Sequence, residues 1–200
     1  MIGSLRGADI LVRALARAGV RRVFALSGTH VTSVFDAALD AQLQLVHVRH
    51  EAAAVHMADA WARLTGEVGV ALVAGGPGHA NAIGALYTAL AAESPVVLLS
   101  GHAPLGELGR GAFQEMRQAD VAAPVCKAAS TATSAAAIGD EVARAFRTAK
   151  EGRPGPVHLS LPTDALEAVA AAGEWLVPHR DAFDVPAAPL GPSAAEATLA

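Results

Sequence analysis

Residues 68–101 read VGVALVAGGPGHANAIGALYTALAAESPVVLLSG, and this stretch decides the fold. An apolar run over 68–74 predicts a strand, a glycine-rich turn follows it, and an alanine-rich segment over 80–91 predicts a helix. A second apolar run over 96–100 predicts another strand. Both runs are almost continuously apolar, which is typical of strands in a parallel sheet that is covered on both faces.

The same alternation of strand and helix continues on both sides of this unit. Two of the flanking helices place their apolar residues on one face at a helical period. The sequence therefore predicts an α/β fold, with a parallel sheet flanked by helices on both faces. Outside the central unit, we expect strands over 20–26, 43–48 and 157–161, helices over 10–18, 31–39, 50–64 and 138–149, and a short helical turn around 113–118.

The C-terminal part differs in composition from the rest of the chain. Residues 177–192 are polar and include four prolines, which indicates an interdomain linker. The sequence SAAE over 193–196 is a capping box, which opens a helix, and the sequence ends within about a turn of it. We therefore expect a domain over 1–172, a linker over 173–192 and the truncated start of a next domain over 193–200.

Composition narrows the class of protein. The 200 residues are 52% hydrophobic and 17% charged, which favours one folded domain over disorder. The net charge of -4 gives no sign of a nucleic-acid partner. No apolar run reaches the ~20 residues of a membrane span, and the first residues lack the layout of a signal peptide, so we expect a cytoplasmic location and no membrane partner.

Metal and disulfide sites are not predicted either. The single cysteine, Cys126, excludes an internal disulfide and a thiolate zinc cluster, and is expected to be a small buried residue. Three histidines lie near residue 51, but they do not form a His-Glu-x-x-His motif. We therefore expect no metal ligands in this chain.

Glu51 is the first candidate catalytic residue. It opens the helix expected over 50–64, directly after the strand over 43–48, and ligands of parallel sheets bind at the carboxyl ends of strands. A carboxyl group removed from water in such a crevice can exchange protons near neutral pH. The alternative is a purely structural role, because a helix N-terminus favours a carboxylate in any case.

The loop from Gly75 to Asn81 is the second candidate. Glycines allow a backbone to approach a ligand closely, and the helix that follows offers free N–H groups. The loop is neither a dinucleotide-binding fingerprint nor a phosphate-binding P-loop, so a tight strand-to-helix turn is the alternative. Ser27 and Gly28 follow an earlier strand in the same way, and no Gly-x-Ser-x-Gly motif indicates a hydrolase.

Taken together, these stretches resemble the N-terminal, pyrimidine-binding domain of thiamine-diphosphate-dependent enzymes, in particular acetolactate synthase, benzoylformate decarboxylase and oxalyl-CoA decarboxylase. Order and spacing agree from about Gly7 to Asp164. The segments that carry the resemblance are RHEAAAVHMADA (49–60), GPGHAN (76–81), ESPVVLLSG (93–101), AFQE (112–115) and GRPGPVHLSLP (152–162).

The resemblance implies roles for several residues. Glu51 matches the family glutamate that hydrogen-bonds the aminopyrimidine ring of the cofactor and favours its imino tautomer. Gly76 and Asn81, with Pro77 between them, match the loop that lines the pyrimidine. Gln114 matches a residue near the reacting centre.

Two features depart from the family pattern. The family turn Phe-Gly-x-Pro-Gly reads Phe-Ala-Leu-Ser-Gly here, so Ser27 stands in place of a proline beside Gly28. His79 replaces a small residue, and we weigh a substrate-proximal acid–base role against a role in stabilising the loop.

The resemblance also implies what lies outside this chain. In the family, a diphosphate-binding domain of the same or another chain holds the diphosphate and Mg²⁺ through a Gly-Asp-Gly motif, which this sequence lacks. The full-length enzyme can also carry FAD in a middle domain. We therefore expect half a site that acts on a small 2-oxo acid, in a homodimer or tetramer. The alternatives are a stand-alone subunit of a split decarboxylase and a non-catalytic α/β binding or regulatory module.

Overall fold

The computed structural model describes residues 4–41, 43–171 and 176–186. Its centre is a six-stranded sheet in the order β3-β2-β4-β5-β7-β6, in which every neighbouring pair is parallel. The strands are β2 (Arg22–Ala25), β3 (Gln44–His47), β4 (Gly69–Val73), β5 (Val96–His102), β6 (Ala128–Thr131) and β7 (Val157–Pro162). The predicted α/β fold with a parallel sheet is confirmed.

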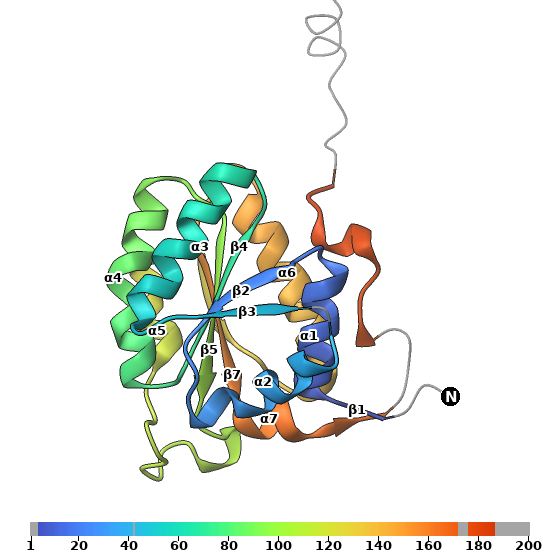
Figure 1. The fold of residues 1–200 in the computed structure, drawn as a ribbon. Helices are drawn as coiled ribbons and strands as arrows, with labels where there is room; N and C mark the ends of the chain where they lie inside the picture. Colours follow the sequence, from blue (N-terminus) through green and yellow to red (C-terminus); the bar gives the residue numbers. More distant parts are fainter. Residues whose placement is uncertain (1–3, 42, 172–175, 187–200) are drawn as a thin grey trace, which may run out of the picture.

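Helices cover both faces of this sheet (Figure 1). We call one side the α1 face; it is covered by α1 (Gly7–Arg17), α2 (Thr32–Leu39) and α6 (Ile138–Lys150). We call the other side the α4 face; it is covered by α3 (Glu51–Thr65), α4 (Pro77–Ala91) and α5 (Gln118–Ala122). At one end lie α7 (Thr163–Glu167) and a small antiparallel pair of β1 (Leu5–Arg6) and β8 (Val169–Ala170).

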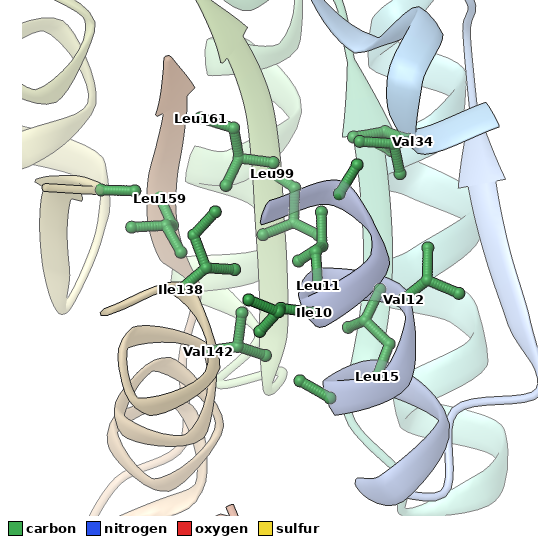
Figure 2. Packing of buried hydrophobic residues seen from close by; sticks show 14 of the residues in the cluster. Ile10, Leu11, Val12, Leu15, Val34, Leu99, Ile138, Val142, Leu159 and Leu161 are labelled. Atoms are coloured by element: carbon green, nitrogen blue, oxygen red, sulfur yellow. The ribbon is translucent and has the colours of Figure 1, made fainter. Parts of the chain in front are cut away.

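The α1 face contains a tightly packed apolar core (Figure 2). Helices α1 and α6 each carry one apolar side, as their sequences predict, and this side lies against alternate residues of the central strands. In β5, Val97 and Leu99 point to this face, while Val96 and Leu98 point to the other. The two central strands, β4 and β5, are therefore buried on both faces of the sheet, which explains why their sequences are continuously apolar.

One local expectation is wrong, and two features of the fold were not expected. The helical turn expected around 113–118 is wrong, since Phe113 and Gln114 form a turn and the helix α5 begins only at Gln118. Strand β6 was not expected, because its sequence AAST lacks the β-branched apolar residues that mark the other strands. The pair of β1 and β8 is too short to give a pattern.

Part of the predicted linker packs against the domain. Leu176 and Phe183 are buried, and the Phe183 ring meets Phe146 of α6 edge-on, with ring centroids 5.9 Å apart. Asp184 pairs with Lys150 at 2.7 Å. Residues 172–175 and 187–200, which include the predicted start of a next domain, lie outside the described residues. The domain boundaries remain a prediction. None of the described helices is long and apolar enough to cross a membrane.

Candidate cofactor site

The predicted site residues gather where the strand order of the sheet reverses. The chain leaves β2 for β3 on one side, then returns past β2 to place β4 on its other side. Such a switch point opens a crevice at the carboxyl ends of the two strands. Here the loops after β2 and β4 come very close, since a Cβ atom on Gly28 would lie 2.5 Å from the Cβ of Ala74.

Glu51 is the first residue of α3 and reaches the loop after β4. Its Oε2 accepts a hydrogen bond of 3.0 Å from the Nδ2 of Asn81 in α4. A Cβ atom on Gly78 would lie 3.0 Å from the Oε1 of Glu51, so the glycine leaves room for the carboxylate. The Glu51 side chain is half-buried and Asn81 is exposed, so the crevice is more open in this chain than the sequence predicts.

The helix α3 places Glu51 through its own N-terminus. The preceding residue, His50, has extended backbone angles and accepts a hydrogen bond from the Ala52 N–H through its Nδ1, at 3.2 Å. A histidine ring therefore caps this helix, although serine, threonine or aspartate is more usual at that position. The carboxylate lies in the first turn, where the helix dipole stabilises negative charge.

Gly76 and Gln114 also meet, although 38 positions separate them in the chain. Gly76 has a φ of 55°, which favours glycine, and a Cβ atom there would lie 2.7 Å from the carbonyl oxygen of Gln114. Gln114 itself has a φ of 56°, which is uncommon for a residue with a side chain. The loop with the predicted substrate-proximal glutamine therefore lies directly on the predicted cofactor loop.

Two other predicted residues occupy the rim of the crevice. Pro77 is exposed and is the first residue of α4, a position that suits proline because the first helical N–H groups lack partners. Ser27 is exposed in the loop that follows β2, one residue before Gly28.

His79 lies below the crevice and not inside it. Its side chain is fully buried, and its Nδ1 shares a hydrogen bond of 2.9 Å with the Oγ of Ser100. Its ring packs against His158 with centroids 4.5 Å apart. Burial lowers the pKa of His79 to about 4, so the ring is neutral at pH 7. These contacts favour the loop-stabilising alternative for His79, and we propose no proton transfer through it.

The structure adds residues that the sequence patterns did not single out. The His30 ring stacks on Phe113, 5.8 Å away and nearly parallel at 9°, and its Nε2 lies 3.2 Å from the Phe113 carbonyl oxygen. The Nε2 of His102 lies 3.2 Å from the Met116 carbonyl oxygen. Two histidines thus hold the loop that carries Gln114. The sequence signal that could have indicated His30 is its position two residues after Gly28.

A hollow of about 350 Å³ lies at the opposite, amino-terminal end of the strands, and contains none of the predicted site residues. It is lined by residues such as Trp61, Arg21, Glu67 and Lys150, and the last three already form ion pairs. Because its charged residues are already paired, this hollow is weaker support for a site than the convergence of glycines and polar side chains at the switch point.

Comparison with known families agrees with this geometry. Residues 5–122 match the family described as "Thiamine pyrophosphate enzyme, N-terminal TPP binding domain". This match covers more than half of the chain and includes all the residues that converge on the crevice. The chain therefore belongs to the family of thiamine diphosphate enzymes, as a member of its N-terminal domain.

Individual relatives show which proteins this chain is similar to. The chain is 40% identical over 185 residues to the catabolic acetolactate synthase of Raoultella terrigena, which covers 92% of this chain and 33% of that protein. It is 44% identical over 163 residues to the acetolactate synthase isozyme 3 large subunit of Escherichia coli (strain K12), covering 81% and 28%. It is 39% identical over 160 residues to 2-hydroxyacyl-CoA lyase 2 of Danio rerio, covering 80% and 26%. The chain thus spans a third or less of the length of these relatives.

The described residues fit one end of thiamine diphosphate. Glu51 offers a carboxylate beside Gly78, where a Cβ atom would fill the space next to Oε1, and Gly76 allows the Gln114 loop to approach closely. Among residues 4–41, 43–171 and 176–186, no group of three or more histidine, cysteine or acidic side chains is placed to hold a metal ion.

Proposed function

We propose that this chain supplies the pyrimidine-binding half of a thiamine diphosphate site in an enzyme that acts on 2-oxo acids, as an acetolactate synthase does. The observation that carries the proposal is the contact of Glu51 with Asn81 and Gly78 at the switch point of the sheet. Membership of the family and the acetolactate synthases among the relatives support it.

Each residue then has a defined task. Glu51 holds a proton between its carboxyl group and the aminopyrimidine ring, and Asn81 orients that carboxyl group through Oε2. Gly76, Gly28 and Pro77 shape the crevice with backbone and ring atoms, and Gln114 lies where it can contact the substrate. When bound, thiamine diphosphate supplies the electron sink for decarboxylation and carbon–carbon bond formation.

The other half of the site must come from a second surface. We propose a diphosphate-binding domain, in the same or another chain, that holds the diphosphate through Mg²⁺ and covers the open side of Glu51. We call this domain together with the present chain the complete enzyme. FAD and a homodimer or tetramer remain proposals that follow from the family resemblance. A cytoplasmic location remains a proposal that follows from the sequence pattern alone.

The substitution Glu51→Gln in the complete enzyme tests the proposal. Glutamine keeps the size of the side chain but cannot hold the proton, so we expect turnover of pyruvate at saturating cofactor to fall by about 100-fold or more. Glu167→Gln in α7 is a matched control, because Glu167 is exposed and lies in another element. Unchanged turnover in Glu51→Gln would contradict the role given to Glu51.

Two further measurements test the proposed function against a non-catalytic module and distinguish between two classes of substrate. Isothermal titration of the complete enzyme with thiamine diphosphate and Mg²⁺ should show binding, whereas its absence would favour a non-catalytic module. Assays with pyruvate and with a 2-hydroxyacyl-CoA should distinguish the reactions named for the two kinds of relative. We expect pyruvate to be consumed.

A further inference from the structure

The side chain of Gln118 is buried beneath the cofactor loop, with only 1% of the residue exposed. Its Oε1 accepts a hydrogen bond of 2.7 Å from the Gly76 N–H. Its Nε2 donates to the carbonyl oxygen of Gly101 at 3.1 Å and to the Oγ of Ser160 at 3.0 Å. One side chain therefore connects α5 to the loop after β4 and to the carboxyl ends of β5 and β7.

Only an amide of this length satisfies all three partners. An amide offers one oxygen acceptor and two N–H donors, and here the oxygen and both donors are engaged. A carboxylate of the same shape would place negative charge against the Gly101 carbonyl oxygen. An apolar side chain would leave the buried N–H of Gly76 without its acceptor, which is costly.

The hydrogen bond between Gln118 and the Gly76 N–H affects the positions of several residues. Gly76 immediately precedes α4, and the first five residues of this helix include Gly78 and Asn81, which contact Glu51. Gln114, four residues before Gln118, lies directly on Gly76. Gln118 thus connects the two loops that line the crevice, although the Gly76–Gln118 bond spans 42 positions of the chain.

We propose that Gln118 is a positioning residue that fixes the Gly76 amide and thereby sets the distance between the Gln114 loop and the first turn of α4. The proposal rests on the proposed function in that this geometry serves the binding of the thiamine pyrimidine. Gln118 does not itself touch the crevice, because its polar atoms are engaged below the loop.

Two substitutions in the complete enzyme separate positioning from simple packing. Gln118→Met keeps length and volume but removes all three hydrogen bonds, so we expect the Kd for thiamine diphosphate to rise by about 10-fold or more. Gln118→Glu keeps the acceptor, and its burial favours the neutral carboxyl form, which can also donate to Gly101 or Ser160. Its Kd should therefore approach the wild-type value at pH 6 and rise at pH 8.

Two of the titratable groups that face this position do not produce such a pH response themselves. His79 from α4 and His158 from β7 are both buried and have pKa values lowered by burial, so they stay neutral over this range. His102 from β5, which is bonded to the carbonyl oxygens of Ala103 and Met116, is present in both proteins, so the Kd of Gln118→Glu is compared with that of the wild type at each pH. Gln44→Glu at the exposed start of β3 is a matched control and should show no such trend.

Hydrogen exchange of the Gly76 amide provides a readout that does not depend on the cofactor. We expect this amide to exchange at least 10-fold faster in Gln118→Met than in the wild type. If Gln118→Met fails to fold, the pH dependence of Gln118→Glu carries the test. Wild-type cofactor affinity in Gln118→Met, or a Kd ratio for Gln118→Glu that is constant with pH, would overturn the proposal. A wild-type enzyme that binds no thiamine diphosphate would instead overturn the proposed function, while the exchange rate would still report on Gln118.

Discussion

The two faces of the sheet are built from different side chains. On the α1 face, large aliphatic residues such as Leu11, Leu15, Ile138 and Leu159 fill the space between helices and strands (Figure 2). On the α4 face, the helices present mostly alanine, and the strands place Ser100, His158 and Ser160 beneath the cofactor loop. Strand β7 separates the two kinds of surface by simple alternation, with Leu159 on one side and its two polar neighbours on the other.

This difference indicates that the α1 face contributes mainly to stability, whereas the α4 face positions the loops that carry the predicted site residues. Large side chains bury much apolar area and supply most of the hydrophobic stabilisation. Small side chains allow α3 to approach β4 and α4 closely, and Glu51 lies within hydrogen-bonding distance of Asn81. The buried polar groups then hold the loops in one arrangement, at the cost of needing nearly complete hydrogen bonding.

The largest effect on stability is expected on the α1 face. Leu99 is completely buried in the middle of β5, so Leu99→Ala should lower the free energy of unfolding of this chain by about 2–5 kcal/mol. Urea unfolding followed by circular dichroism would measure the change. Leu39→Ala at the exposed end of α2 is the control and should change stability by less than about 0.5 kcal/mol. Equal effects at the two sites would contradict the assignment of this core.

On the α4 face, stability should depend on pH through His79. Its pKa is about 4 in the folded chain and 6.5 in the unfolded chain, so only the unfolded state takes up a proton between these values. Stability is therefore full above pH 6.5 and should fall by about 3 kcal/mol as the pH drops to 4. Acid titration of the unfolding free energy would show this slope, and His79→Gln should reduce it. An unchanged slope in that variant would rule out His79 as the titrating group.

A smaller effect is expected where α3 approaches the sheet. A Cβ atom on Gly69 in β4 would lie 2.0 Å from the carbonyl oxygen of Ala58 in α3, so Gly69→Ala should destabilise the chain by about 1–3 kcal/mol and displace α3. The matched control is Gly84→Ala in the exposed part of α4, where no atom lies within 4 Å of the new methyl group. That substitution should instead stabilise the helix by about 0.5–1 kcal/mol. Chemical denaturation should show stability changes of opposite sign in the two variants, and a loss of stability in both would contradict the difference in packing between Gly69 and Gly84.

Most of the fold could be predicted from local patterns. Continuous apolar runs alternating with helical segments indicate buried parallel strands, and the strands β2, β4, β5 and β7 follow this rule. Strand β3 was also predicted, but it lies at the edge of the sheet and is only partly buried. Strand β6 escaped prediction because alanine, serine and threonine in a four-residue run give no distinctive pattern. The Gln114 loop was misjudged as helical because its conformation depends on contacts with His30 and Gly76, which lie far away in the sequence.

The sequence by itself determined the α/β class, because apolar periodicity is a local property, and it indicated the family through the order and spacing of several motifs. The same resemblance selected Glu51, Gly76, Asn81 and Gln114 as predicted site residues. Only the tertiary structure decided that Gln114 packs directly against Gly76 and that His79 is buried beneath the crevice. It also decided that Gln118 connects the loop after β4 to the loop that carries Gln114. The physical reason is that the order of strands in the sheet determines which loops meet at the carboxyl edge. That order follows from the packing of the whole chain, and no local periodicity records it.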